Sequence, residues 1–329
     1  MHILIIGAAG MIGRKLSERL LDDWQLNNQP ISELTLVDVI EPSGSQTASS
    51  KLHTIKADLT ASGAAEKLIK TKPDVIYHLA AIVSGEAEAD FDKGYLINMD
   101  GTRALLDAIR AQHGIDSYTP KLIFTSSIAV YGAPFPPVID DEFHQTPLTS
   151  YGTQKAICEL MIADCNRRGF LQAIGLRLPT ICIRPGLPNK AASGFFSNIL
   201  REPINGKSAV LPVDDTVRHW FASPRAAIGF LLHAASLTSK DIGLRCNMNL
   251  PGLCATVAEQ IEALHRVVGS EAVGLIERRS DPTIKSIVAN WPEAFDATRA
   301  IDMGFVAEQS FDDIINVYLE DELPDSKDR

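Results

Sequence analysis

Short apolar runs alternate with amphipathic stretches through the first half of the chain. Short apolar runs predict buried strands, and apolar residues repeated every three or four positions predict helices. The predicted strands cover residues 2–6, 34–39, 53–57, 74–79, 121–126 and 171–178. The predicted helices cover residues 11–23, 62–71, 90–113 and 149–169. This alternation predicts an α/β fold, with helices on both faces of a doubly wound parallel sheet.

A glycine-rich turn follows the first predicted strand directly. It has the spacing G-x-x-G-x-x-G and opens the first predicted helix. Glycines let the backbone turn tightly and approach a pyrophosphate, which the N–H groups of the helix N-terminus attract. Strand, turn and helix in this order predict a dinucleotide site in a Rossmann-type fold, and an ordinary glycine turn is the weaker alternative. The predicted pyrophosphate residues are Gly7, Gly10, Met11, Ile12 and Gly13.

The second predicted strand ends in a carboxylate, Asp38. A carboxylate at this point of a Rossmann unit accepts hydrogen bonds from the adenosine ribose hydroxyls. It also repels a 2′-phosphate, so we expect NAD and not NADP as the cofactor. The alternative is a solvated aspartate at the end of a strand.

A tyrosine and a lysine stand four residues apart near the start of the helix predicted over residues 149–169. At this spacing Tyr151 and Lys155 share one helix face. A cation beside a tyrosine favours the phenolate and lowers a pKa that is otherwise about 10. A phenolate is a general base that can remove a proton from an alcohol. Such a pair is common by chance, but its occurrence together with the dinucleotide motif favours a catalytic role.

The composition narrows the expected partners. The 329 residues carry a net charge of −10 and contain no apolar run of about 18 residues, so we expect neither nucleic acid nor a membrane as a partner. The cysteines form no C-x-x-C pair and no metal spacing with histidine, so we expect no metal, reduced thiols and a cytoplasmic protein. They are Cys158, Cys165, Cys182, Cys246 and Cys254.

The pattern changes after about residue 180, where proline and glycine become frequent and the alternation stops. We therefore predict an NAD-binding domain over residues 1–180 and a smaller, mainly substrate-binding region over residues 181–329. Segments of the second region can return to the sheet of the first, because no long linker separates the two. Loops on a rigid scaffold usually carry specificity, which favours the loop-rich region as the substrate side.

With these features, the chain resembles the extended short-chain dehydrogenase/reductase family, which includes nucleotide-sugar epimerases and dehydratases. The resemblance covers nearly the whole chain and rests on an ordered set of motifs. The matching positions are Gly7, Gly10, Gly13, Asp38, Asp58-Leu59, Leu79-Ala80-Ala81, Asn98, Thr125-Ser126-Ser127, Val130-Tyr131-Gly132, Tyr151 and Lys155.

The resemblance implies further contacts with the cofactor. Asp58 and Leu59 would sit by the adenine. The segment Leu79-Ala80-Ala81 would run under the pyrophosphate and the nicotinamide ribose. Pro179 and Thr180 would lie near the nicotinamide. Ser126 would touch the cofactor or the backbone.

The resemblance also implies the catalytic roles. Ser127 matches the catalytic serine, with a simple serine-rich turn as the alternative. Tyr151 would accept the hydroxyl proton, and Ser127 would hydrogen-bond the same substrate oxygen. Lys155 would hold the nicotinamide ribose and stabilise the phenolate. Asn98 would hold a water or a backbone group that relays protons onward from Lys155.

Within the family, the chain is most similar to NAD-dependent enzymes that act on small sugar acids. The nucleotide-sugar epimerases usually carry an Arg-Asp-aromatic-x-His-x-x-Asp segment, and this chain keeps its arginine, as Arg218, but lacks its histidine and its later aspartate. Arg218 would bind a carboxylate bidentately, with a surface or structural ion pair as the alternative. Arg184 is a weaker candidate, as is His219. The other predicted substrate residues are Val83, Ser84, Ser127, Tyr151 and Phe195.

The expected function is therefore oxidation of a secondary alcohol of a small sugar acid by hydride transfer to NAD. The resemblance further implies a homodimer formed through the helices at 90–113 and 149–169. Two alternatives stay open: a nucleotide-sugar epimerase with tightly held NAD, and a non-catalytic protein that senses dinucleotides.

Overall fold

The computed structural model describes residues 1–42, 50–186 and 193–323, which form two compact units. The first unit comprises residues 1–130, 149–177 and 228–248. The second comprises residues 131–148, 178–227 and 249–329. The chain therefore passes between the units several times, and each unit is described by itself below.

The first unit is built on a seven-stranded sheet with the order β12-β8-β7-β6-β1-β4-β5. The pairs β1–β4, β1–β6, β4–β5 and β6–β7 are parallel, with Ile3 opposite Leu34 on one side and Val75 on the other. The predicted α/β fold is confirmed. The strands are β1 (His2–Ile6), β4 (Glu33–Asp38), β5 (Leu52–Lys56), β6 (Val75–His78), β7 (Lys121–Ser127), β8 (Gln172–Leu178) and β12 (Asn247–Asn249).

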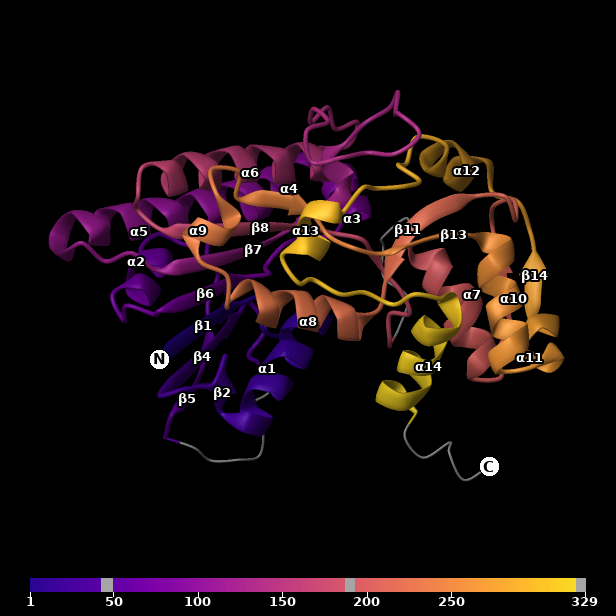
Figure 1. The fold of residues 1–329 in the computed structure, drawn as a ribbon, viewed down its shortest axis with the longest axis horizontal. Helices are drawn as coiled ribbons and strands as arrows, with labels where there is room; N and C mark the ends of the chain where they lie inside the picture. Colours follow the sequence, from indigo (N-terminus) through magenta and orange to yellow (C-terminus); the bar gives the residue numbers. More distant parts are fainter. Residues whose placement is uncertain (43–49, 187–192, 324–329) are drawn as a thin grey trace. The chain divides into compact units, whose positions relative to one another are not determined.

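Helices cover both faces of this sheet (Figure 1). Helices α5 and α6 lie on one face, and α1 and α8 lie on the other. The helices of the first unit are α1 (Met11–Asp23), α2 (Ala64–Ile69), α3 (Ser84–Ala89), α4 (Phe91–Gly94), α5 (Gly101–Asp116), α6 (Ser150–Arg167), most of α8 (Pro224–Ala234) and α9 (Ser239–Ile242). A short 3-10 helix, η2 (Ile128–Val130), and the small hairpin of β2 (Gln25–Leu26) and β3 (Gln29–Pro30) complete it.

The helix predicted over residues 90–113 is three segments. A π-helical turn, η1 (Tyr95–Asp100), separates α4 from α5. Turns of this kind insert one extra residue per turn and often mark functional sites. Asn98, one of the predicted site residues, lies in this turn and is buried.

The core of the first unit explains why its central strand is more apolar than its edge strand. Ile3, Leu4 and Ile5 of the central strand β1 are completely buried, as expected for a strand covered by helices on both faces. The edge strand β5 is mostly exposed, and His53, Thr54 and Lys56 are polar there. Position in the sheet thus decides how apolar a strand is.

The second unit has its own core and its own sheets. Strand β11 (Arg218–Ala222) pairs in parallel with β9 (Thr180–Ile181) and antiparallel with β13 (Leu253–Thr256), and β10 (Ala209–Leu211) pairs with β14 (Ile276–Arg278). Its helices are α7 (Gly194–Ile204), α10 (Val257–Val267), α11 (Ser270–Gly274), α12 (Pro282–Val288), α13 (Thr298–Asp302) and α14 (Phe311–Glu322). An apolar cluster that includes Phe196, Phe221 and Ile314 is buried between them.

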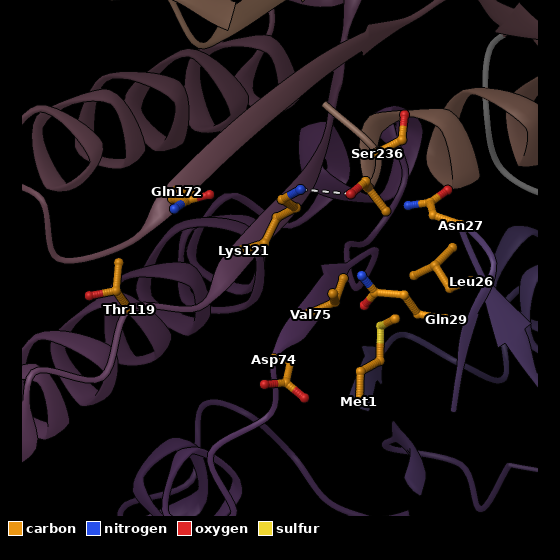
Figure 2. Close-up of a pocket in the computed structure, with 11 residues that line it drawn as sticks. Met1, Leu26, Asn27, Gln29, Asp74, Val75, Thr119, Lys121, Gln172 and Ser236 are labelled. Atoms are coloured by element: carbon orange, nitrogen blue, oxygen red, sulfur yellow. Dashed lines mark hydrogen bonds between the residues drawn. The ribbon is translucent and has the colours of Figure 1, made fainter. Parts of the chain in front are cut away.

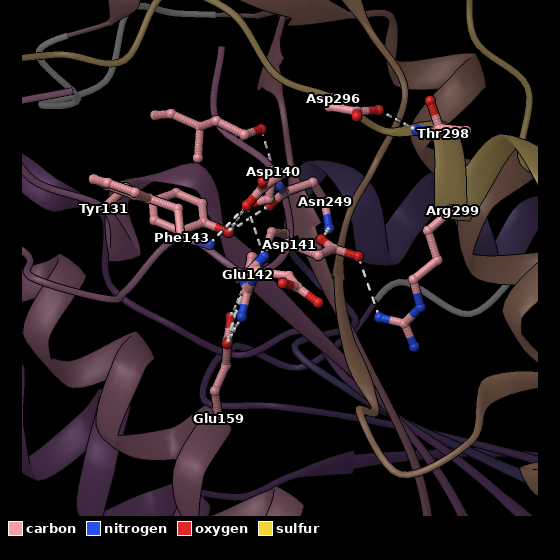
Figure 3. Close-up of polar contacts among 12 residues, drawn as sticks. Tyr131, Asp140, Asp141, Glu142, Phe143, Glu159, Asn249, Asp296, Thr298 and Arg299 are labelled. Carbon is pink, nitrogen blue, oxygen red and sulfur yellow. Dashed lines mark hydrogen bonds and ion pairs between the residues drawn. The ribbon is translucent and has the colours of Figure 1, made fainter. Parts of the chain in front are cut away.

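Polar contacts hold the loop over residues 131–148 within the second unit (Figure 3). Tyr131 Oη donates to Asn249 Oδ1 at 2.8 Å, and the Asn249 N–H donates to Asp141 Oδ1 at 2.6 Å. Arg299 Nη1 donates to the other oxygen of Asp141 at 3.2 Å. Segments far apart in the sequence are thereby joined in one network.

None of the described helices is both long enough and apolar enough to cross a membrane.

Candidate active site

The glycine-rich turn has two glycines that the backbone requires. Gly7 has a φ of +93°, which favours glycine, and a Cβ on Gly13 would lie 2.1 Å from the carbonyl oxygen of Gly7. The N–H groups of Gly7 and Ala8 both donate to the carbonyl oxygen of Val37, at 2.8 and 3.1 Å. The turn is therefore packed tightly against β4 and its own helix.

Gly10 has a different role, because a Cβ there would meet nothing closer than 3.5 Å. Its backbone is extended, it is exposed, and it is the N-cap of α1 without a side-chain cap hydrogen bond. Packing within the unit does not demand glycine here. The absent Cβ instead leaves room for a ligand at the helix N-terminus, which fits the pyrophosphate of a dinucleotide.

Asp38 ends strand β4 and holds this turn in place. Its Oδ2 accepts the N–H of Ala9 at 2.9 Å, and its Oδ1 accepts the N–H of Ile40 at 3.3 Å. The sequence indicated a ribose contact for Asp38 and gave no sign of the bond to Ala9. The ribose contact stays a prediction.

The other residues predicted to contact the cofactor follow the carboxyl ends of neighbouring strands. Asp58 and Leu59 follow β5, and Asp58 Oδ1 accepts both the N–H and the hydroxyl of Thr60 at 2.9 and 2.7 Å. Leu79, Ala80 and Ala81 follow β6, and a Cβ on Gly7 would lie 2.6 Å from Ala80 N. Parallel sheets bind ligands at this edge.

Tyr151 and Lys155 lie in the first turns of α6, as predicted. Thr149 is the N-cap, and its Oγ1 accepts the N–H of Gly152 at 3.1 Å. The N–H of Ser150 donates to Glu88 Oε2 at 2.9 Å, a contact that the sequence did not reveal. These contacts satisfy N–H groups that the start of a helix leaves unpaired. They fix the residue at which α6 begins, and with it the positions of Tyr151 and Lys155 along the helix.

The Lys155 ammonium is buried within the first unit. Its Nζ donates to the carbonyl oxygen of Thr125 at 2.8 Å and lies 5.7 Å from the centroid of the Tyr151 ring and 4.6 Å from that of Phe124. Burial lowers the pKa of Lys155 to about 8, while the Cys158 and Glu159 side chains act in the opposite direction. A cation therefore stands beside the tyrosine, as the proposed general base requires.

The two serines at the end of β7 have different partners. Ser127 is partly exposed, and its Oγ accepts the N–H of Ala129 at 3.1 Å, which leaves its O–H to donate elsewhere. Ser126 is buried, and its hydroxyl donates to the Glu159 carboxylate. The cofactor contact of Ser126 and the catalytic role of Ser127 stay predictions.

Asn98 joins two segments of the predicted site. Its Oδ1 accepts the N–H of Ile82 at 2.8 Å, and its Nδ2 donates to the carbonyl of Ile82 and to Gln154 Oε1 at 3.2 and 2.8 Å. Gln154 precedes Lys155 and is fully buried. The Asn98 side chain thus ties the segment after β6 to α6, and its relay role stays a prediction.

The carbonyl of Asn98 ends a buried chain of hydrogen bonds. It accepts the Thr102 hydroxyl at 2.8 Å and the Cys158 thiol at 3.2 Å. Thr102 Oγ1 in turn lies 2.8 Å from His78 Nε2. Burial, together with the Lys155 charge, lowers the pKa of His78 to about 3, so His78 is neutral.

The predicted substrate residues are divided between the units. Val83 is the N-cap of α3 and Ser84 its first residue, both in the first unit. In the second unit, Phe195 is buried in the core, and Arg184 donates from Nη2 to Ser193 Oγ at 3.0 Å. Arg218 is exposed beside Cys254 Sγ. Their contacts with a substrate stay predictions.

Two further predicted residues lie in the second unit. Pro179 is buried, and Thr180 Oγ1 lies 2.7 Å from His219 Nε2. His219 Nδ1 lies 2.9 Å from the carbonyl oxygen of Pro292, and its ring stacks on Phe196. Burial lowers the pKa of His219 to about 4, so this histidine is neutral.

A cavity of about 460 Å³ lies at the opposite edge of the sheet in the first unit (Figure 2). Met1, Asp74, Lys121 and Gln172 line it where β1, β6, β7 and β8 begin. Lys121 Nζ donates to the carbonyls of Ala235 and Leu237 at 2.6 and 2.8 Å. The predicted cofactor residues instead follow the carboxyl ends of the strands, and none of them lines this cavity.

The described residues contain no group of three or more histidine, cysteine, aspartate or glutamate side chains placed to hold a metal ion.

Comparison with known proteins identifies a family, and relatives that match nearly the full length of the chain. Residues 3–223 match the model of the NAD dependent epimerase/dehydratase family. A D-erythronate dehydrogenase from Cupriavidus necator is 43% identical over 98% of both chains, and one from Haemophilus influenzae is 39% identical over 97% of this chain and 99% of its own.

Solved structures resemble the chain over nearly its whole length. A crystal structure described as a nucleoside-diphosphate-sugar epimerase from Agrobacterium tumefaciens is 60% identical, with a TM-score of 0.96 over 98% of this chain and 95% of its own. An L-threonine 3-dehydrogenase from Trypanosoma brucei has a TM-score of 0.84 over 97% of this chain and 96% of its own, at 24% identity, and shows the fold alone.

Proposed function

Because this chain belongs to the NAD dependent epimerase/dehydratase family, we propose that it is an NAD-dependent dehydrogenase that oxidises a small sugar acid. The proposed substrate is D-erythronate, whose C2 alcohol becomes the ketone of 2-dehydro-D-erythronate. The observation that carries the proposal is the identity with two D-erythronate dehydrogenases over nearly the full length of all three chains.

The residues of the first unit suit this chemistry. NAD, when bound, supplies the acceptor for the hydride. Tyr151 takes the proton from the substrate hydroxyl, and Ser127 donates a hydrogen bond to the same oxygen. The Lys155 ammonium, 5.7 Å from the centre of the Tyr151 ring, favours the phenolate that accepts the proton. Placement and charge are the protein's contribution.

Formation of NADH tests the proposal directly. The purified protein is mixed with NAD and a panel of acids that contains D-erythronate and its four-carbon isomers, with UDP-sugars alongside. Steady formation of NADH with D-erythronate is expected. The absence of NADH formation with every acid of the panel would contradict the proposal. The matched control is Tyr151→Phe, which should lower kcat by about a thousandfold or more while NADH binding changes little.

A nucleotide-sugar epimerase is the second candidate, and the description of the relative from Agrobacterium tumefaciens favours it. The family includes epimerases, and the catalytic residues of the two reactions are shared. This candidate predicts NAD that co-purifies with the protein, interconversion of a UDP-sugar and no net NADH. The same assay therefore separates the two functions.

The proposal includes a cytoplasmic homodimer that forms through the helices predicted at 90–113 and 149–169, which correspond to α4, η1, α5 and α6. Large apolar side chains exposed on these elements include Phe91 at 59%, Leu96 at 47% and Leu160 at 66%. Burial of such side chains favours association. Light scattering on the eluted protein would report a monomer if this part of the proposal is wrong.

A further inference from the structure

A buried ion pair lies behind the catalytic pair in the first unit. Glu159 of α6 is fully buried, and Arg177 of β8 is 6% exposed. Arg177 Nε donates to both oxygens of Glu159 at 3.1 Å, and its Nη2 donates to Oε2 at 2.8 Å. The Ser126 hydroxyl donates to Oε1 of the same carboxylate.

The stability of the fold does not by itself account for this pair. Removing two charges from water costs about as much as their attraction returns, and apolar residues of similar volume often serve as well. The mechanism described above uses neither Glu159 nor Arg177. Their position relative to the active residues suggests another reason for their presence.

Glu159 connects the two elements that carry the catalytic residues. It lies four residues after Lys155, so the two side chains share a face of α6. Its partner Ser126 stands between Thr125, whose carbonyl accepts Lys155 Nζ at 2.8 Å, and Ser127. The carboxylate therefore fixes the end of β7 against the helix at the point where Lys155 and Ser127 must be aligned.

Cys158 and, more weakly, Glu159 raise the pKa of Lys155 against the effect of burial, and Glu159 is the carboxylate of the two. Among the described residues of the first unit, the other titratable groups near Lys155 are Tyr151 and Cys158 of α6 and His78 of β6, and His78 is neutral. The charged side chains of the other helices packed on α6 are at least partly in solvent, which screens them. They are Glu86, Glu88, Asp90, Asp92, Lys93, Asp100, Arg103, Asp107, Arg110 and Asp116.

We propose that Glu159 is a positioning residue for the active site, which ties the end of β7 to α6 and so places Lys155 and Ser127 relative to one another. The same buried carboxylate favours the ammonium form of Lys155. Arg177 holds the carboxylate in place through its three hydrogen bonds. The inference rests on the proposed function, in which the Lys155 ammonium acts on the Tyr151 phenolate.

The test measures the titration of Lys155 in the NAD-free protein. NMR of lysine labelled with ¹³C at Cε follows the ammonium, and Lys155→Met identifies its signal. In Glu159→Gln, the midpoint should fall by about one pH unit or more, because an attractive charge is lost while Arg177 remains. In the double variant Glu159→Gln/Arg177→Met, the midpoint should lie between those of Glu159→Gln and the wild type.

A purely structural role predicts the opposite sign. Loosening of the site would admit water and raise the midpoint from about 8 toward the ordinary value of 10.5. A midpoint at or above the wild-type value in Glu159→Gln would overturn the proposal. If that variant does not fold, the same result in the double variant, which leaves no unpaired buried charge, would overturn it.

A matched control lies on the exposed face of the same helix. Asp164 pairs with Arg167, and both side chains are 66% exposed. Asp164→Asn also removes one negative charge from α6, but solvent screens that charge, so the Lys155 midpoint should not move. Comparable changes in Asp164→Asn and Glu159→Gln would mean that net charge, and not the buried contact, sets the midpoint, which also overturns the proposal.

Activity gives a second readout. The alkaline limb of kcat/KM should move to lower pH in Glu159→Gln, and kcat/KM on that limb should fall about tenfold for each pH unit by which the midpoint falls. If no acid is oxidised while the NMR midpoints behave as expected, the proposed substrate is wrong and the positioning role stands. If D-erythronate is oxidised and the midpoints do not move, only the positioning role is wrong.

Discussion

Helices α1 and α6 of the first unit begin in opposite ways. The first turn of α1 follows a glycine-rich turn, and its N-cap residue, Gly10, provides no side-chain cap hydrogen bond. The start of α6 is capped by the Thr149 hydroxyl, and the Glu88 carboxylate binds the N–H of Ser150. The helix end predicted to receive the pyrophosphate has no side-chain cap, and the end that carries the predicted catalytic side chains is capped.

The difference shows that a helix N-terminus can have two uses. Backbone N–H groups that no side chain satisfies are donors for an anion, and a missing Cβ lets that anion approach. Donors that are satisfied within the protein fix the residue at which the helix begins. Tyr151 and Lys155 then lie one turn apart at fixed positions in α6. Substitutions at each end should therefore have separable effects on stability and on binding.

The largest effect is expected at Gly13. A Cβ in Gly13→Ala would lie 2.1 Å from the oxygen of Gly7, so the turn must shift, and we expect unfolding free energy to fall by about 3 kcal/mol or more. Urea denaturation measures this. In the control Gly114→Ala, within helix α5, nothing lies within 4 Å, so this change should stabilise by about 0.5–1 kcal/mol. Equal stabilities of the two variants would contradict the role of Gly13.

A smaller effect, on binding and not on folding, is expected at Gly10. The Cβ of Gly10→Ala fits the protein but occupies the space assigned to the pyrophosphate. We expect the Kd for NAD to rise about tenfold or more, measured by calorimetry, while the unfolding free energy changes by less than about 1 kcal/mol. Unchanged NAD affinity would place the pyrophosphate elsewhere.

The smallest effect is expected at Thr149. Thr149→Ala removes the acceptor for the Gly152 N–H and should lower the unfolding free energy by about 1 kcal/mol. Thr149→Ser keeps the acceptor and should retain most of that stability. NAD binding should be the same in both variants, since this end of α6 places side chains. A loss of NAD affinity in Thr149→Ala comparable to that of Gly10→Ala would remove the distinction between the two ends.

Much of the first unit could be predicted because its signals are local. The helix predicted over residues 11–23 matches α1, and the strands near residues 2–6, 34–39 and 121–126 match β1, β4 and β7 within about one residue. These three strands are almost entirely buried, so a short apolar run is a sufficient signal. Family motifs then supplied most of the candidate site.

What the sequence did not reveal depends on contacts between distant residues. Glu159 and Arg177 appear as ordinary charged residues until the fold brings them together with Ser126. The short strand β12 could not be recognised, because three residues, Asn247 to Asn249, give no periodicity. The π-helical turn at Asn98 likewise has no sequence pattern of its own.

The repeated passage of the chain between the two units has a consequence for synthesis on the ribosome. The first unit needs residues 228–248 as well as its N-terminal segments. At translation rates of about 5–20 residues per second, the stretch between residues 177 and 228 delays its last piece by several seconds. The first unit, whose synthesis begins first, is therefore completed late. Until β12 is made, the nascent chain exposes the edge of β8 with which β12 pairs.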